Sequence, residues 1–129
     1  MKRLYQLFLL LLALLLPTSA HAQVKIDGIY YNFLYSSVYG LLAEVIAGED
    51  PYSGDVTIPE KVTYDGTNYY VKVIGDYAFS ECSGLTSVTM PNSIKSIESY
   101  AFNGCNGLKN IIIPNSVESI GTYAFQNCI

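Results

Sequence analysis

Three cysteines at a fixed spacing are the residues with the clearest potential for chemistry. Cys82, Cys105 and Cys128 stand 23 residues apart. A catalytic cysteine needs a nearby base, usually histidine, and a positive charge that stabilises its thiolate. The only histidine, His21, and the only arginine, Arg3, lie in the first 22 residues, which have the features of a cleaved signal peptide. A single nucleophile would also not recur in every repeat, so we expect no thiol enzyme.

The same cysteines could instead bind a metal or form disulfides. Closely spaced cysteine pairs typical of zinc sites are absent, which leaves only a weak case for three ligands in successive repeats. Equivalent residues in stacked strands lie about 4.8 Å apart, within the Cα range of a disulfide. However, parallel Cβ directions do not give the near-perpendicular disulfide torsion, and three cysteines leave one unpaired. We therefore predict buried free thiols and no cofactor.

Acidic residues provide one further candidate, in the segment GEDPYSGD. Glu49, Asp50 and Asp55 could belong to a calcium loop or to one half of a glycosidase pair. The segment lacks regular spacing of oxygen ligands, and no opposing carboxylate can be assigned, so a solvated turn is the favoured interpretation. Without histidine, and with no phosphate-binding loop, the sequence predicts a protein that is not an enzyme. Part of a secreted carbohydrate-active enzyme remains the less favoured alternative.

The cysteines belong to a longer repeat, which we place at residues 54–129. Ala-Phe pairs and several isoleucines, leucines and prolines recur with the same step of 23 residues. Such a period predicts a solenoid in which each repeat is one coil that stacks on the next. The predicted repeat core consists of Ile74, Phe79, Cys82, Leu85, Val88, Met90, Ile97, Phe102, Cys105, Leu108, Ile111, Ile113, Ile120, Phe125 and Cys128.

Each repeat contains one short predicted strand. In LTSVTMP and LKNIIIP the first, fourth and sixth residues are apolar, which indicates alternate inward-facing side chains before a proline that ends the strand. Stacked strands would form a parallel sheet along one side. The outward positions of this sheet form the candidate interaction face: Thr57, Ser87, Thr89, Asn110 and Ile112. A second aromatic series, Tyr77, Tyr100 and Tyr123, is expected to pack at the edge of the core, with surface recognition as the alternative.

The complete motif resembles a known family. The pattern L-x-x-V/I-x-M/I-P-N-S-I/V-x-S-I-x-x-Y-A-F-x-x-C is similar to the leucine-rich repeats of the BspA-like group, found in secreted and surface proteins of Bacteroides-type bacteria and some protists. The resemblance implies a mainly β, right-handed solenoid of about three coils, the last one incomplete. It also implies adhesion to host extracellular matrix proteins or to other bacteria.

The N-terminus predicts export. A basic start at Lys2 and Arg3, an apolar run over residues 7–16 and an Ala-x-Ala sequence at Ala20 and Ala22 form a signal peptide, 1–22, cleaved before Gln23. The apolar run is shorter than the roughly 20 residues that span a membrane. Cleavage leaves five lysines against eleven acidic residues. A chain without arginine and with this charge is not expected to bind nucleic acid.

The segment between the signal peptide and the repeats has its own pattern. Residues 23–53 contain alternating apolar residues and an Asp27-Gly28 turn, which favour strands that cap the first coil, with a loose linker as the alternative. In the first coil, Asp65-Gly66 predicts an inserted β-hairpin.

The overall expectation is an exported, non-catalytic interaction module, located outside the cell, on its surface or in the periplasm. Its predicted partner is a protein or glycan surface rather than a small-molecule substrate. A structural spacer from a larger multidomain surface protein is the alternative.

Overall fold

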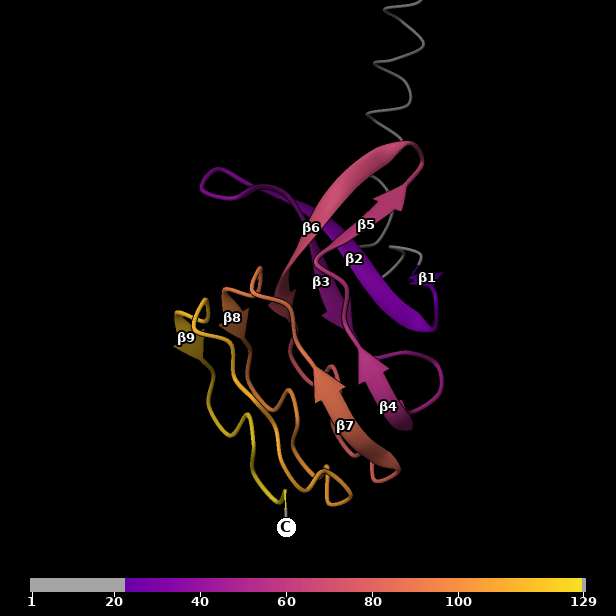
Figure 1. The fold of residues 1–129 in the computed structure, drawn as a ribbon, viewed down its shortest axis with the longest axis vertical. Coiled ribbons are helices and arrows are strands. Elements are labelled where there is room, and N and C mark those ends of the chain that lie inside the picture. Colours follow the sequence, from indigo (N-terminus) through magenta and orange to yellow (C-terminus); the bar gives the residue numbers. More distant parts are fainter. Residues whose placement is uncertain (1–22, 129) are drawn as a thin grey trace, which may run out of the picture.

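The computed structural model describes residues 23–128, which form β-strands joined by turns (Figure 1). The predicted signal peptide, with Ala20 and Ala22, lies outside the described residues, and Gln23 is the first residue described. No helix in the described part of the chain is long and apolar enough to cross a membrane. The strands are β1 (Val24–Ile26), β2 (Ile29–Ser36), β3 (Gly40–Ile46), β4 (Gly54–Thr57), β5 (Lys61–Tyr64), β6 (Thr67–Ile74), β7 (Leu85–Thr89), β8 (Ser96–Ile97) and β9 (Ser119–Ile120).

The larger sheet connects the N-terminal segment to the repeats. Its strands follow the order β1-β2-β3-β6-β8-β9, and β5 also pairs with β6. Strands β1 to β3 are antiparallel, whereas β3, β6, β8 and β9 pair in parallel. Val73, Ser96 and Ser119 lie side by side, so the 23-residue period of the sequence is the register of the sheet. The hairpin predicted at Asp65-Gly66 joins β5 to β6, and both residues adopt positive φ.

The smaller sheet contains only β4 and β7, which pair in parallel. The sequence also predicted a strand at LKNIIIP, but residues 108–113 form no strand, and no backbone hydrogen bond among the described residues joins 109–113 to β7. Gly107 packs against the carbonyl groups of Ser83 and Leu85, so the two segments touch there. Beyond Gly107 they do not pair, which corrects the prediction of a continuous sheet on this side.

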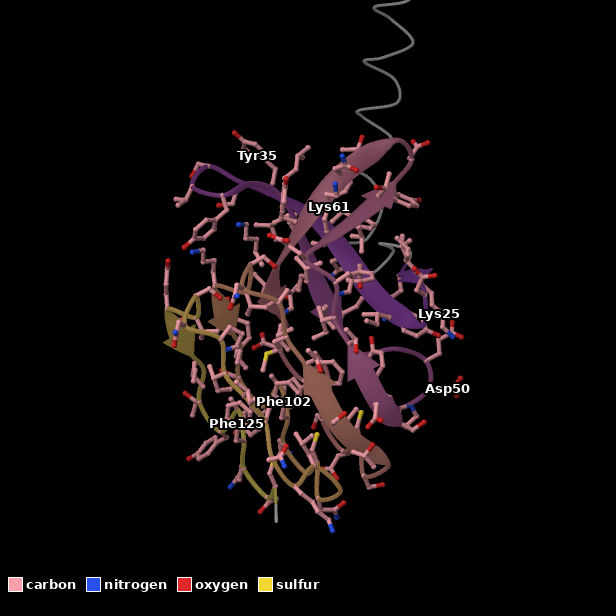
Figure 2. The ribbon with its side chains drawn as sticks, in the orientation of Figure 1. Lys25, Tyr35, Asp50, Lys61, Phe102 and Phe125 are labelled. Carbon is pink, nitrogen blue, oxygen red and sulfur yellow. The ribbon has the colours of Figure 1, made fainter. Side chains whose placement is uncertain are left out.

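The repeats are joined mainly through their turns and through stacked side chains. The amide of Phe79 donates to the carbonyl of Ala101 at 2.7 Å, and that of Phe102 donates to Ala124 at the same distance. The rings of Phe79 and Phe102 are nearly parallel, with centroids 4.9 Å apart, and Phe125 follows at 5.3 Å. Figure 2 shows Phe102 and Phe125 beside one another in the repeats. Identical phenylalanines of successive repeats therefore stack as a column.

Most of the predicted repeat core is buried, with one clear error. The buried members are Ile74, Phe79, Cys82, Leu85, Val88, Ile97, Phe102, Cys105 and Leu108, and the half-buried ones are Met90, Ile111, Ile113, Phe125 and Cys128. The prediction for Ile120 is wrong, because its exposed fraction is 51%. Ile120 lies in β9, the last strand of the described sheet, where no further described repeat covers it.

Candidate interaction face

The candidate face is the outer surface of β4, β7 and the segment that follows Gly107. Residues two apart in a strand point to the same side, so Thr57 and Thr89 extend outward beside one another in the paired register. Thr57, Thr89 and Asn110 are exposed, and Ile112 has an exposed fraction of 84%. Ser87 is half-buried. The structure thus places all five predicted positions along one side of the repeats.

Asp55 is a member of this face that the sequence analysis missed. It lies in β4 rather than in a solvated turn, and its register partner is Ser87. The hydroxyls of Ser87 and Thr86 donate to Asp55 Oδ1 at 2.7 and 2.8 Å. These two hydrogen bonds hold the pKa of the Asp55 carboxyl below its usual value. The signal was present in the alternation, because Asp55 stands two residues before Thr57.

A groove of about 280 Å³ runs beside β7. Thr89 and Met90 line one wall, and Asn110 and Ile112 line the other. Because no described segment pairs with β7 on the side away from β4, this edge of the strand is left without a strand partner. The groove therefore combines hydroxyl and amide groups, apolar side chains and free backbone groups.

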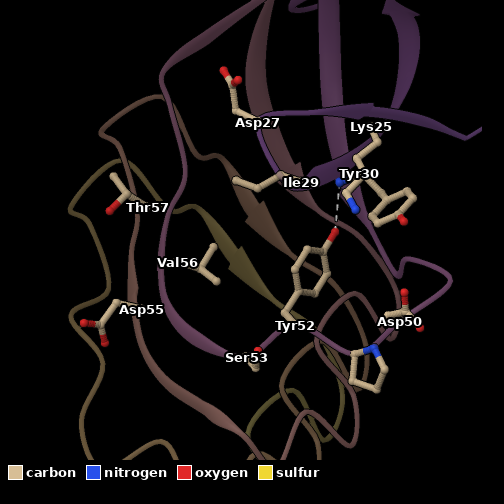
Figure 3. Close-up of a pocket in the computed structure, with 12 residues that line it drawn as sticks. Lys25, Asp27, Ile29, Tyr30, Asp50, Tyr52, Ser53, Asp55, Val56 and Thr57 are labelled. Carbon is tan, nitrogen blue, oxygen red and sulfur yellow. Dashed lines mark hydrogen bonds between the residues drawn. The ribbon is translucent and has the colours of Figure 1, made fainter.

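A second hollow, of about 320 Å³, lies on the other side of β4 (Figure 3). It separates β4 from the β1–β2 turn, and Lys25, Asp27, Asp50 and Tyr52 are among its lining residues. The Tyr52 hydroxyl donates to the carbonyl of Ile46 at 2.6 Å and accepts from the amide of Tyr30 at 3.0 Å. Burial raises the pKa of Tyr52 to about 12. The Tyr52 side chain is therefore uncharged at neutral pH, and its hydrogen bonds hold it in place between the N-terminal strands and the repeats.

The cysteines lie inside the repeats and away from this face. All three are free thiols, with Cys82 and Cys105 buried and Cys128 half-buried. The thiols of Cys105 and Cys128 donate to the carbonyls of Phe79 and Phe102, each at 3.0 Å. Burial raises the pKa of Cys105 to about 12, so its thiol stays protonated at neutral pH. Within residues 23–128, no group of three or more His, Cys, Asp or Glu residues is placed to hold a metal ion.

The second aromatic series forms a column at the surface. Tyr77 and Tyr100 stack with centroids 5.0 Å apart, and Tyr123 follows at 5.3 Å. All three adopt positive φ, which is rare for bulky residues, in the turn that connects successive repeats. The rings of Tyr77 and Tyr100 cover one another, whereas the Tyr123 ring is tilted by 42° from that of Tyr100. Their packing favours a structural role at the edge of the core.

Comparison with known proteins identifies the repeat. The family model described as BspA type leucine rich repeat region (6 copies) matches residues 55–129. No curated protein sequence is significantly similar to the chain.

Several solved structures are similar to this one. A leucine rich cell surface protein of Faecalibacterium prausnitzii is 31% identical with a TM-score of 0.66, over 86% of this chain and 30% of that protein. A leucine-rich repeat protein of Bacteroides ovatus is 27% identical with a TM-score of 0.58, over 83% and 33% of the two chains. One from Bacteroides capillosus is 25% identical with a TM-score of 0.63, over 84% and 95%.

The chain spans about a third of the length of the first two of these proteins. The family match covers more than half of the chain, and the all-β fold with parallel pairing between repeats agrees with it. The chain belongs to the BspA-type leucine-rich repeat family.

Proposed function

We propose that this protein is an exported, non-catalytic binding module that is displayed at the cell surface and contacts a protein or glycan through its strand face. The observation that carries the proposal is the strand face itself, where exposed Thr57 lines one hollow and exposed Thr89, Asn110 and Ile112 line the groove beside β7. The similar Faecalibacterium protein is a cell surface protein, which supports display outside the cell. We propose that this protein mediates adhesion to extracellular-matrix proteins or to other bacteria.

We further infer a right-handed solenoid in residues 54–129, with residues 23–53 as its N-terminal cap. Val45 of β3 is fully buried, and β3 pairs in parallel with β6, so the N-terminal strands cover the first repeat. The Tyr52 ring contacts Phe79 at a tilt of 43°, with centroids 4.7 Å apart, at the N-terminal end of the phenylalanine column. Capping of this kind keeps the apolar end of a repeat array away from water.

The groove beside β7 favours a protein ligand in an extended conformation. Free backbone groups along a groove can pair with an added strand, and the side-chain pockets then select its sequence. Val88 lies at the bottom of the groove and Ile112 at its rim, so an apolar side chain of the ligand would have a place to bind. A glycan would use the hydroxyls of Thr89 and Ser87 but would leave most of the backbone groups unpaired.

The test is substitution of the strand face with charged residues. Thr89→Lys and Ile112→Asp should each weaken binding to an immobilised panel of extracellular-matrix proteins by about tenfold, as expected for central interface positions. A glycan array measured in parallel separates the two ligand classes. Val38→Asp is the matched control, because Val38 is almost as exposed as Ile112 but lies in the turn between β2 and β3, outside strands β4 and β7. Binding that survives both face substitutions would contradict the proposal.

One observation favours a structural spacer as the second candidate. Two of the similar proteins are about three times longer than the region they share with this chain. A spacer would tolerate Thr89→Lys and Ile112→Asp together, without loss of adhesion by cells that display the protein.

A further inference from the structure

The hairpin of β2 and β3 ends in an exposed apolar tip on the same side of the molecule as β8 and β9 (Figure 1). We define the hairpin tip as residues 34–41. It contains no charged residue, and the nearest charge along the chain is Glu44. Five of its side chains are large, apolar and exposed: Leu34, Tyr35, Val38, Tyr39 and Leu41. Exposed apolar groups gathered in this way mark an interaction site rather than ordinary surface.

The hairpin tip is apolar on both of its faces. Leu34 pairs with Leu42, and Tyr35 pairs with Leu41, so Leu34 and Tyr35 project to opposite sides of the ribbon. Val38 lies in the turn itself, with an exposed fraction of 77%, and Tyr35 reaches 75%. A protein or glycan surface would contact one side of the hairpin. Insertion of the whole tip into an apolar medium would bury the exposed apolar side chains on both faces of the hairpin.

The turn holds this shape through local hydrogen bonds. The Ser36 hydroxyl oxygen accepts from the amides of Val38 and Tyr39 at 3.1 and 3.3 Å, and Gly40 has a φ of 72°. The Tyr39 hydroxyl donates to Glu118 at 2.8 Å, which ties the hairpin to the repeats. The tip therefore projects as a defined structure and does not need to fold when it binds.

Lysines stand at the base of the hairpin tip. Lys61 lies opposite Tyr70 in the register of β5 and β6. Lys72 Nζ lies 5.6 Å from the centroid of the Tyr70 ring and 6.0 Å from that of Tyr39. Figure 2 shows Tyr35 and Lys61 at the same end of the molecule. Two of the five lysines that follow residue 22 thus flank the tip, although the chain as a whole is acidic.

We propose that the hairpin tip is a lipid-binding element that enters the interface of a bilayer with anionic headgroups. Tyrosine, leucine and valine side chains partition into the boundary between headgroups and acyl chains, while lysines just outside it meet the phosphates. A glycan is less suitable because Lys72 covers the ring faces of Tyr39 and Tyr70 on which a sugar would stack. This inference goes beyond the strand face and does not depend on it.

Vesicle binding tests the proposal. The purified exported protein should float with vesicles of mixed phosphatidylcholine and phosphatidylglycerol, and it should bind more weakly to phosphatidylcholine alone. Val38→Asp should reduce binding about tenfold, since a charge at the tip must then enter the interface. Ile112→Asp, on the strand face, should leave it unchanged. Equal binding by both variants, or no binding by the unmodified protein, would overturn the proposal.

A spectroscopic readout tests insertion directly. The chain contains no tryptophan, so Val38→Trp introduces a single reporter at the tip. Its emission should shift to shorter wavelength when vesicles are added, and that of Ile112→Trp should not. Lys61→Gln combined with Lys72→Gln should reduce the preference for anionic vesicles without removing the blue shift. A Val38→Trp reporter that responds to an added protein but not to vesicles would assign the tip to a protein partner and overturn the lipid proposal.

Discussion

The N-terminal sheet and the repeats achieve burial in different ways. Strands β2 and β6 are eight residues long and are held by long backbone ladders, and their buried side chains gather at one end of each strand, at 29–31 in β2 and at Val71 and Ile74 in β6. Strands β8 and β9 have two residues each, and beyond β7 the rest of the described repeats consists of turns and irregular segments. The repeats instead stack phenylalanine rings on one another, and hydrogen bonds from backbone amides and cysteine thiols join each turn to the next. The stability of the N-terminal sheet thus depends on long paired strands, and that of the repeats depends on contacts between equivalent residues of successive repeats.

The difference has a mechanical consequence. In a long strand pair, the loss of one side chain leaves the backbone ladder intact. In a column, an inner side chain packs against one neighbour in the preceding repeat and one in the following repeat. Its truncation therefore removes packing at two boundaries between repeats. The contribution of a residue should therefore depend on its place in the column as much as on its type, which the following substitutions test.

The largest effect is expected from the centre of the phenylalanine column. Phe102→Ala should destabilise the protein by about 3–5 kcal/mol, because the ring is fully buried between Phe79 and Phe125. Phe125→Ala, with a half-buried ring that stacks on Phe102, should cost about half as much. Urea denaturation followed by circular dichroism measures both. Equal losses for the two variants would show that position in the column does not matter.

The next largest loss of stability is expected for a substitution at the junction between the N-terminal sheet and the repeats. Tyr52→Phe removes a hydroxyl that accepts from Tyr30 and donates to Ile46, so a buried amide and a carbonyl lose their partner. The expected cost is about 1–3 kcal/mol. Tyr35→Phe is the control, since the exposed Tyr35 should change stability by less than about 0.5 kcal/mol. If Tyr52→Phe unfolds at the same urea concentration as the control, the junction does not rely on this hydroxyl.

The cysteine column predicts a smaller loss and a pattern of reactivity. Cys105→Ala should cost roughly 1–2 kcal/mol, and Cys105→Ser should cost more because a buried hydroxyl replaces the thiol. In the folded protein, a thiol reagent should label the half-buried Cys128 before the buried Cys82 and Cys105. Mass spectrometry of digested samples at successive times gives the order. Rapid labelling of Cys105 would show that the repeats open far more readily than their packing implies.

The sequence was most informative where the repeat imposes the structure. The 23-residue step predicted the stacked Phe residues, because each repeat must bury the same positions. The parallel strands β8 and β9, which keep the same step, were not predicted. The sequence did not reveal that 109–113 separates from β7, since LKNIIIP has the same apolar pattern as the strand before it. Asp55 was assigned to a turn because nearby Pro and Gly residues masked a short strand. The hairpin tip was also missed, as exposure of Val38 depends on how far the hairpin projects.

The smallest predicted effect concerns a charge in the N-terminal sheet and its dependence on pH. Burial raises the pKa of Glu44 in β3, and the nearby carboxylates of Asp76 and Glu98 act in the same direction, whereas the Asn32 amide, which donates to Glu44, lowers it. A carboxyl with a raised pKa in the folded state favours folding most at low pH. That contribution is lost as the pH rises through the folded pKa.

Glu44→Gln should therefore stabilise the protein at neutral pH by about 0.5 kcal/mol, because the neutral amide avoids the burial of a charge and can still accept from Asn32. The advantage should disappear as the pH falls below about 4, where Glu44 is protonated in both states. Glu49→Gln, at an exposed position, is the control for the loss of one negative charge. Thermal unfolding at a series of pH values measures the difference between the two variants. A gain for Glu44→Gln that grows toward low pH would have the wrong sign and would show that the carboxylate at Glu44 is stabilised, rather than strained, by its place in the sheet.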